Sequence, residues 1–214
     1  MSSGWMSSGW GRSGLRRFHR LTFAGALTML AGLAQAQQID FMVGGSTLFS
    51  PKNQTASQAF LPPAENGGSY PGASAQIVYE NHFGFNVEAA YRLNKGLYNG
   101  YQRFRPIFYD FNAVYAPRLT HKTGADFMAG VGGETLVFYD QFNSCPNGTG
   151  SCSANVNTTH FLMHAGGGVR YYFFRHFFLR PEAHYSYILG NTNQFHSHNL
   201  MRVGASIGYS WGPQ

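Results

Sequence analysis

The sequence has little charge, only two cysteines and no apolar run long enough to form a transmembrane helix. Charged residues occupy 11% of its 214 positions, whereas aromatic residues occupy 16% and glycine occurs 27 times. So few charges and so many aromatic residues exclude a disordered chain and are atypical of a helical enzyme. The abundance of tyrosine and phenylalanine favours β structure, and the length suits one domain.

The first 36 residues have the pattern of a cleaved signal peptide. Four arginines between positions 12 and 20 precede an apolar run of 13 residues, Leu21 to Leu33. This run is too short to cross the ~30 Å hydrocarbon core of a bilayer as a helix. Ala34-Gln35-Ala36 follows as a small-x-small cleavage site. We therefore expect export, with residues 1–36 removed and residues 37–214 forming the mature domain.

Removal of residues 1–36 changes the charge balance of the chain. Four of the 15 basic residues and none of the nine acidic residues lie there, which leaves eleven basic residues and a net charge of +2 instead of +6. The apparent basicity of the full chain is therefore no nucleic-acid signature, and we expect no nucleic-acid partner.

The two cysteines, Cys145 and Cys152, are separated by six residues in a stretch rich in glycine, asparagine and serine. In an exported chain this spacing favours a disulfide that closes a small loop. Two thiolates with no histidine close in sequence are too few ligands for zinc, so a metal site is the weaker alternative.

After Ile39 the sequence repeatedly alternates apolar residues with polar or small ones, which is the period of a half-buried β-strand. No helical stripe of ten or more residues interrupts this pattern. Eight segments qualify as strands: 39–50, 71–81, 84–95, 105–118, 125–140, 159–174, 177–189 and 199–211.

The predicted connections alternate in length. Short turns lie at 81–83, 120–124 and 175–176, and longer polar loops lie at 51–70, 96–104, 141–158 and 190–198. Outer-membrane barrels have short periplasmic turns, longer extracellular loops and an even number of strands. The pattern therefore predicts an all-β fold, an eight-stranded antiparallel up-and-down transmembrane β-barrel.

The two faces of the predicted strands differ in chemistry. In segment 177–189, Leu179 and Tyr185 lie on one face, while Arg180 and Glu182 lie on the other. Because a shift of one residue would move every side chain to the opposite face, we expect the apolar set to face lipid and the polar set to face the lumen. The predicted lumen polar network is Glu80, Glu88, Arg92, Asp110, Asp126, Glu134, His160, His164, Arg170, Arg180, Glu182, His184 and Arg202.

Aromatic residues near the strand ends are expected to form the girdles at the two membrane interfaces. An eight-stranded barrel has an interior that side chains can fill, so the lumen charges predict a packed ion-pair core rather than an open pore. A narrow ion path along Arg170, Arg180, Glu182 and Arg202 is the alternative. The expected girdle residues are Tyr79, Phe85, Tyr91, Tyr109, Tyr115, Tyr139, Tyr171 and Tyr209.

Over residues 39–211 the sequence resembles the eight-stranded outer-membrane barrels of the OmpA/OmpX type. The most particular feature is the alternating stretch from Met201 to Trp211, which ends on an aromatic residue as the assembly signal of that family does, although Gly212-Pro213-Gln214 follow here. The resemblance implies a porin-like barrel in the outer membrane with lipid and the barrel-assembly machinery as partners, and without a cofactor. No peptidoglycan-binding domain follows the barrel.

Three functions are compatible with these observations. The first is a non-enzymatic envelope barrel that acts through its loops, chiefly 51–70 and 141–158, on an unidentified extracellular ligand. The second is a lipid hydrolase, because His184-Tyr185-Ser186 is similar to the His-x-Ser of outer-membrane lipid A deacylases. That motif has asparagine in place of Tyr187 and a downstream carboxylate, whereas no acidic residue follows Glu182. The third is a soluble lipocalin-like carrier with an apolar cavity.

The nine histidines also raise the possibility of a metal site. His160 and His164 share a strand face, but four strand residues span ~13 Å, so these two cannot bind one ion alone. His184 could approach either one, depending on the register. His196 and His198 could bind a metal in a loop, although a polar loop without metal is the simpler interpretation.

Overall fold

The computed structural model describes residues 38–51, 65–79, 82–98, 102–142, 152–191, 195 and 197–212; for 140–142 and 152–154 it describes the backbone only. These residues belong to one compact unit that spans 37–214. No helix in the described ranges is long and apolar enough to cross a membrane.

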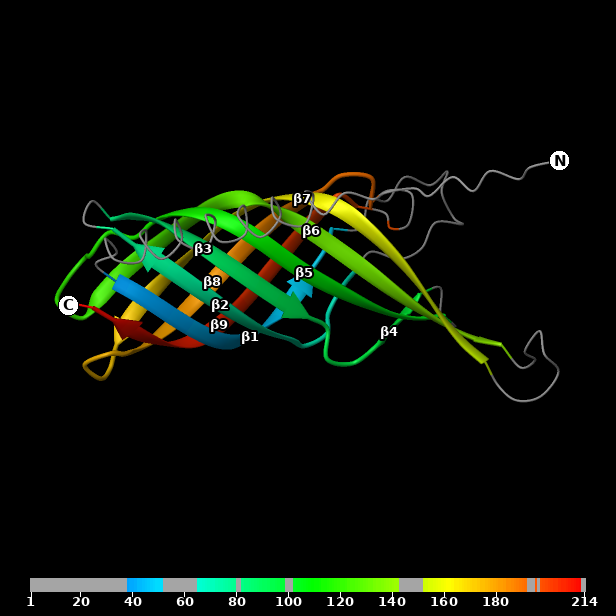
Figure 1. Ribbon diagram of the computed structural model, residues 1–214, viewed down its shortest axis with the longest axis horizontal. Coiled ribbons are helices and arrows are strands. Elements are labelled where there is room, and N and C mark those ends of the chain that lie inside the picture. The colour runs from blue at the N-terminus through cyan, green and yellow to red at the C-terminus, as the bar shows by residue number, and fades with distance from the viewer. Residues whose placement is uncertain are drawn as a thin grey trace, which may run out of the picture. The chain divides into compact units, whose positions relative to one another are not determined.

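The described chain is built from antiparallel β-strands, with tight turns at one end of the fold (Figure 1). Apolar and polar side chains alternate along these strands. Successive side chains point to opposite faces, so one face of each strand is apolar and points outward, and the other points into the interior. Their bounds are β1 Gln38–Phe49, β2 Tyr70–Val78, β3 Phe83–Tyr91, β4 Gly96–Tyr98, β5 Gln102–Tyr115, β6 Thr123–Phe142, β7 Cys152–Tyr172, β8 Phe177–Ile188 and β9 Asn199–Trp211.

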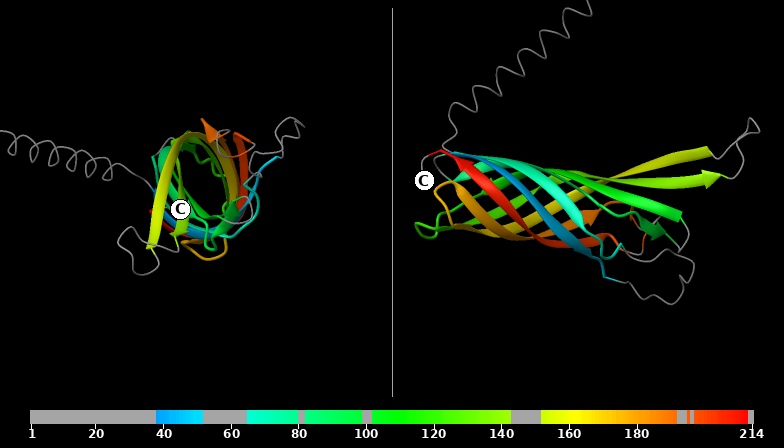
Figure 2. Two further views of the ribbon diagram at one scale, coloured as in Figure 1. Left: turned by 90° about the vertical axis from the view of Figure 1, so that its right-hand side faces the viewer. Right: turned by 90° about the horizontal axis from the view of Figure 1, so that it is seen from below.

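Eight of these strands close into a barrel. Each pairs with its neighbours in sequence, the first pairs with the last through Ile39↔Trp211, and β3 pairs directly with β5 through Glu88↔Asp110. The short strand β4 extends only the loop end of β5. Viewed end-on, the strands form a complete ring (Figure 2). The predicted eight-stranded up-and-down barrel is therefore confirmed.

The strand bounds differ from the prediction mainly at the loop end. The segment 96–104 was expected to be a loop, but β4 pairs with β5 there, through Leu97↔Arg103. The expected loop 141–158 is much shorter, because β6 and β7 remain paired as far as Phe142↔Cys152. Both segments are rich in polar residues, and for that reason they were predicted as loops. Strands that lie beyond the membrane need no apolar face, so polar residues do not exclude them.

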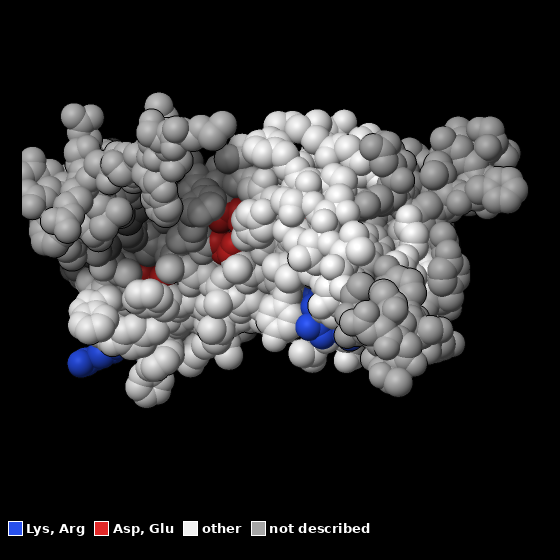
Figure 3. All heavy atoms as spheres, turned by 45° about the vertical axis from the view of Figure 1, so that its right-hand side comes forward, with Lys and Arg blue, Asp and Glu red and all other residues white. Residues whose placement is uncertain are grey.

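The exposed wall of the barrel is apolar. Phe41, Phe85, Phe111, Phe127 and Ile207 are each at least half exposed, and each lies at an outward position of its strand. The face shown in Figure 3 is almost free of charged side chains. Such a wall is stable against lipid and unfavourable against water, which contradicts the lipocalin-like alternative.

The longest strands, β6 and β7, project beyond the rest of the barrel (Figure 2). A strand of 20 residues spans ~66 Å, whereas the apolar band of an outer-membrane barrel is ~25 Å tall. In the described part of the chain, pairing of β8 to β7 ends at Leu162↔Ile188, while residues 152–160 of β7 continue to pair with β6. We call the projecting parts of β6 and β7, residues 136–142 and 152–160, the ribbon.

The lumen also contains apolar side chains, which the sequence reading did not assign to it. Leu48, Phe108, Leu162, Ile188 and Leu200 are buried together with Tyr70 in the extracellular half. A second cluster forms nearer the loops. The strand residues among them have the same parity as the polar network. Met42, Val114, Met128 and Phe178 are also buried at this parity nearer the turns, so polar and apolar side chains share the interior along its length. The second cluster contains Phe104, Leu136, Phe138 and Phe195, with Tyr98 packed against it.

Candidate functional site

The periplasmic half of the lumen is closed by ion pairs. Arg170 bridges two acids, with Nη1 2.6 Å from Oδ2 of Asp40 and Nε 2.6 Å from Oδ2 of Asp126. Arg180 continues the chain through Asp126 at 3.5 Å and Glu182 at 2.5 Å. Of the five members of these bridges, Asp40, Asp126, Arg170 and Arg180 are buried and Glu182 is half-buried. Buried charges are stable only when paired in this way.

A glycine makes room for this arrangement. A Cβ atom placed on Gly168 would lie 2.9 Å from Cγ of Arg180 and equally close to the Pro181 carbonyl oxygen. The bare backbone of β7 therefore lets the Arg180 side chain cross the lumen toward Asp126. This explains why a glycine stands in the middle of a membrane-spanning strand, where it would otherwise cost packing.

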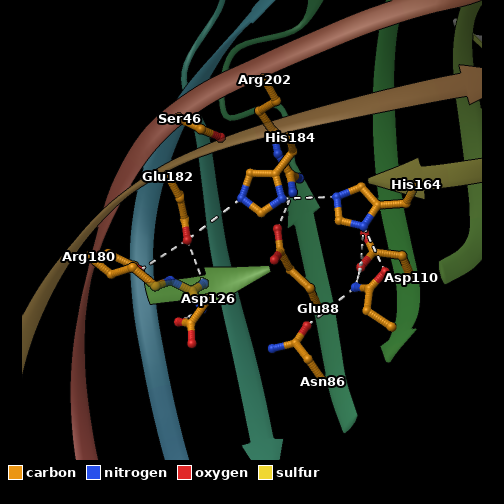
Figure 4. A network of polar contacts seen from close by, with 12 residues as sticks. Ser46, Asn86, Glu88, Asp110, Asp126, His164, Arg180, Glu182, His184 and Arg202 are labelled. Atoms are coloured by element: carbon orange, nitrogen blue, oxygen red, sulfur yellow. Dashed lines mark hydrogen bonds and ion pairs between the residues drawn. The ribbon is translucent and has the colours of Figure 1, made fainter. Parts of the chain in front are cut away.

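Above the ion pairs, two histidine rings meet in the middle of the lumen (Figure 4). Nε2 of His164 lies 2.9 Å from Nδ1 of His184, and the rings are nearly parallel with centroids 5.1 Å apart. His184 Nε2 faces Glu182 at 3.6 Å. At the other end, His164 Nδ1 lies 2.7 Å from Oδ1 of Asn112. The prediction that His184 could approach His160 or His164 is thus resolved in favour of His164.

The hydrogen-bond network defines which ring nitrogen carries hydrogen. The side-chain amide of Asn112 donates to Asp110 and Asn86, so its oxygen must accept from Nδ1 of His164. Nε2 of His164 then accepts from Nδ1 of His184.

Arg202 and Glu88 form a further ion pair beside the histidines (Figure 4). The Arg202 guanidinium donates from β9 to the carboxylate of Glu88 on β3, across the lumen. The described histidine, cysteine and acidic residues include no group of three placed to hold a metal ion. The centre of the barrel is thus an electrostatic network that links strands on opposite sides.

At the loop end of the lumen, Glu65 enters from the segment before β2. Its carboxyl group lies near that of Glu134 on β6, and both side chains are buried. None of the four carboxyl oxygens has a hydrogen-bond partner among the described residues. Burial, opposed by the nearby Arg92, raises the pKa of Glu65 from 4.5 to about 7.

The segment that carries Glu65 is held by backbone contacts. Gly67 donates its N–H to the Leu48 carbonyl at 2.8 Å, and Leu93 donates to the Ser69 carbonyl at 2.8 Å. Gly67 and Gly68 both adopt positive φ angles, +68° and +94°. A side chain at Gly68 would also collide with Nε of Arg92, at 2.6 Å. These two glycines are therefore the turn that directs Glu65 inward.

Little space remains inside the barrel between these groups. One cavity of about 20 Å³ adjoins Ser46, Tyr70 and Glu88, and another of about 10 Å³ adjoins Phe108, Asp110 and Arg202. Each has about the volume that one water molecule needs. The described side chains pack closely around both cavities.

Of the predicted network, the buried members are Asp110, Asp126, Glu134, His164, Arg170, Arg180, His184 and Arg202, while Glu88, Arg92, His160 and Glu182 are half-buried. Glu80 and Cys145 lie outside the described residues, as does the side chain of Cys152. The sequence reading missed Asp40, Glu65, Asn86 and Asn112. Strand parity could have found Asp40, Asn86 and Asn112, because each has the parity of a predicted lumen residue on the same or the adjoining strand. Nothing in the sequence indicated Glu65, which is in a loop.

The geometry also bears on the hydrolase alternative. His184 is 2% exposed, faces the lumen and is engaged with His164 and Glu182. A lipid on the outer wall could not reach it. The only acid beside His184 on its own strand is Glu182, which is paired with Arg180. The pattern His184-Tyr185-Ser186 therefore lacks the arrangement that a serine hydrolase needs.

The sequence matches no protein-family model and shows no significant similarity to a curated protein. The solved structures that it resembles include several outer-membrane β-barrels. Ail, the attachment invasion locus protein of Yersinia pestis, superposes with a TM-score of 0.55 at 10% identity, over 82% of this chain and 99% of Ail. The chain has the fold of the small outer-membrane β-barrels.

Two further outer-membrane barrels agree. A major outer membrane protein of Thermus thermophilus has a TM-score of 0.51 and 9% identity over 81% of this chain and 99% of its own. Neisserial surface protein A has a TM-score of 0.50 and 10% identity over 80% and 95%. A second Ail structure contains the heparin analogue sucrose octasulfate, with a TM-score of 0.50 and 12% identity over 81% and 98%. Identities this low show a shared fold.

Proposed function

We propose that this protein is a non-enzymatic barrel of the bacterial outer membrane whose lumen is closed and whose activity lies in contacts made by its extracellular end. The observation that carries the proposal is the division of the barrel into an apolar outer wall and an interior that holds buried ion pairs and apolar clusters. A general pore needs an open lumen, and an enzyme needs a reachable polar site. The outer-membrane barrel fold of the similar structures supports the location.

Export by a cleaved signal peptide belongs to this proposal. The barrel begins with β1 at Gln38, so cleavage after Ala36 would remove no part of the barrel. Assembly by the barrel-assembly machinery is supported by the alternating last strand, which ends on the outward-facing Trp211.

The ribbon is the part best placed to make extracellular contacts. Asn155, Val156 and Asn157 are all exposed, so both faces of β7 meet solvent there. Among the described residues, the ladder between β7 and β8 begins at Leu162↔Ile188, so it does not reach the β7 edge at residues 155–157. At the exposed residues 155–157 this edge can pair with an extended segment of another molecule. We therefore assign the surface role to the ribbon rather than to the lumen.

Three measurements test the barrel. Unboiled protein in detergent should migrate faster on a gel than boiled protein, because a folded barrel resists detergent until heated. The Ile207→Arg variant should lose this compact form, since an arginine near mid-bilayer costs roughly 2 to 4 kcal/mol. Asn157→Arg, on the ribbon, should retain it.

Purified barrels in planar bilayers should show no stable conductance; steady ion currents through wild-type protein would contradict the closed lumen.

The surface role needs a separate test. A variant in which residues 139–155 are replaced by a two-residue Asn-Gly turn should still form the compact barrel. Cells that display wild-type protein should adhere to heparin-coated beads, a probe chosen because Ail was solved with a heparin analogue, or to an immobilised extracellular-matrix extract, and the shortened variant should not. Equal adhesion by both would contradict a role of the ribbon. Release of acyl chains from labelled lipid A by wild-type barrels would favour the hydrolase instead.

A further inference from the structure

An open groove runs along the outer wall over β1, β2, β3 and β5 and continues onto β8 and β9. Ala73, Ala75 and Ala89 form its floor between β1 and β5, and its volume is about 680 Å³. The ladders place Ala73 directly opposite Ala89, so small side chains adjoin one another on neighbouring strands. Phe41 and Phe111 stand on either side and are 57% and 64% exposed. This volume lies within the ~300–1,000 Å³ of sites that bind small molecules.

Three cations lie above this groove, toward the extracellular rim. Arg103 and Arg105 occupy outward positions of β5, on the same face as Tyr109 and Phe111 of the groove wall. Lys95 precedes β4 and lies with Nζ 3.6 Å from the ring centroid of Tyr139, whose strand pairs with Arg103. Because Arg105 is four residues from Tyr109, the cations begin ~13 Å above the groove. We call these three residues the rim cations.

The rim cations face no described acid on the outer wall. Arg105 donates to the Leu93 carbonyl at 3.1 Å and lies over the Tyr91 ring at 6.0 Å, both neutral groups. All described acidic side chains are buried or point into the lumen. They are Asp40, Glu65, Glu88, Asp110, Asp126, Glu134 and Glu182.

We propose that this wall binds a phosphorylated, acylated lipid of the outer leaflet, with a phosphate on Lys95, Arg103 and Arg105 and an acyl chain in the alanine groove. The inference rests on the proposed membrane location, which makes the groove face hydrocarbon and places the rim cations at the headgroups. Arginine binds phosphate oxygens in a bidentate manner, and clusters of basic residues near a membrane surface attract anionic headgroups.

A second copy of the chain is a poorer occupant of this groove. Two copies in one membrane would be related by an axis along the membrane normal, which would bring their rim cations to the same height and close together. The described outer wall supplies no acid to compensate this repulsion. A phosphorylated lipid supplies both the negative charge and the apolar chain that the wall lacks.

Native mass spectrometry of the folded mature barrel, released from detergent after incubation with diphosphorylated lipid A, tests the proposal. Wild-type protein should retain one lipid A molecule, and should retain dephosphorylated lipid A and phosphatidylethanolamine roughly tenfold less. The triple variant Lys95→Gln/Arg103→Gln/Arg105→Gln should lose retention of lipid A to the same degree. The matched control Lys122→Gln/Arg175→Gln, which alters exposed cations of the opposite turns, should retain it.

Variants of the groove floor test the acyl-chain site separately from the rim cations. Ala73→Leu/Ala89→Leu fills the floor and should weaken retention of lipid A, whereas Ala113→Leu, at an outward alanine that does not line the groove, should not. Equal retention by wild type and the triple variant, or lipid-free dimers that Ala73→Leu/Ala89→Leu abolishes, would overturn the proposal. The gel assay distinguishes failure of the proposed membrane barrel from failure of the lipid site. A wild-type chain that never becomes compact contradicts the membrane barrel, whereas a compact barrel that retains no lipid A contradicts only the lipid site.

Discussion

His164 on β7 and His184 on β8 share one hydrogen bond of 2.9 Å between Nε2 and Nδ1, at the centre of the barrel interior. Only one hydrogen can lie between these nitrogens, so the two rings cannot both be fully protonated without separating. The pair also joins the acidic Glu182 on one side to Asn112 and Asp110 on the other. This relationship makes the histidines the link between the two halves of the polar network.

Replacing His184 should therefore destabilise the barrel. His184→Leu leaves Nε2 of His164 without a donor, and an unsatisfied buried polar group costs about 1 to 3 kcal/mol. The urea concentration at which the compact gel form is half lost should fall accordingly. His121→Leu, at an exposed turn residue, is the control and should leave the midpoint within error. An unchanged midpoint in His184→Leu would show that the pair is not structural.

Arg170 should be the most sensitive position of the periplasmic half. Arg170→Met leaves Asp40 without a cationic partner, and removal of one member of a buried ion pair costs about 3 to 5 kcal/mol. The same unfolding measurement should show a much larger loss than for Arg175→Met, in the exposed turn. Adding Asp40→Asn to Arg170→Met should restore part of the stability. If the double variant were no more stable than the single one, the bridge to Asp40 would be unimportant.

The burial of Glu65 near Glu134 should make docking of the first loop depend on pH. Burial raises the pKa of Glu65 from 4.5 to about 7, so the docked segment binds this proton more tightly than the free segment. Docking is then strongest below pH 4.5 and weakens as the pH rises through about 7. The amide resonances of Gly67 and Leu93 should shift with a midpoint near 7. Glu65→Gln should abolish that midpoint, whereas an identical titration in the variant would exclude Glu65 as its source.

Cleavage after Ala36 has a spectroscopic consequence. It removes Trp5 and Trp10, which leaves Trp211, 72% exposed on the outer wall, as the only tryptophan of the mature chain. Tryptophan emission of the mature barrel should be quenched by lipids with brominated acyl chains. The variant Trp211→Phe should show no tryptophan emission at all. Residual emission from membrane-extracted Trp211→Phe protein, or an intact N-terminal sequence, would show that the signal segment is retained.

Cys145 and Cys152 should form a disulfide at the tip of the ribbon. Because the ring they close is short and lies outside the membrane-spanning ladder, reduction should change barrel stability very little. Alkylation of protein isolated without reductant should label no thiol, and alkylation after reduction should label two. Labelling of two thiols before reduction would disprove the disulfide.

The sequence determined the closed barrel because its information is local. Alternation along each strand, such as Arg180 and Glu182 against Leu179 and Tyr185, decides which face meets lipid, and a shift of one residue would place charges in hydrocarbon. Turn lengths then decide the up-and-down order. The same alternation fixes strand parity, which is why Asp110, Asp126 and Arg170 could be named before their contacts were known.

Only the tertiary structure decided which of these side chains meet. The contact between His164 and His184, and the bridge from Arg170 to Asp40, depend on the stagger between strands and on closure of β1 against β9. Those long-range relations leave no trace in the alternation of any single strand. Glu65 enters the lumen from a loop, and the alanine groove forms from strands whose small residues coincide only in this register. Pairing across strands, rather than the pattern within them, therefore produced the contacts on which the proposals rest.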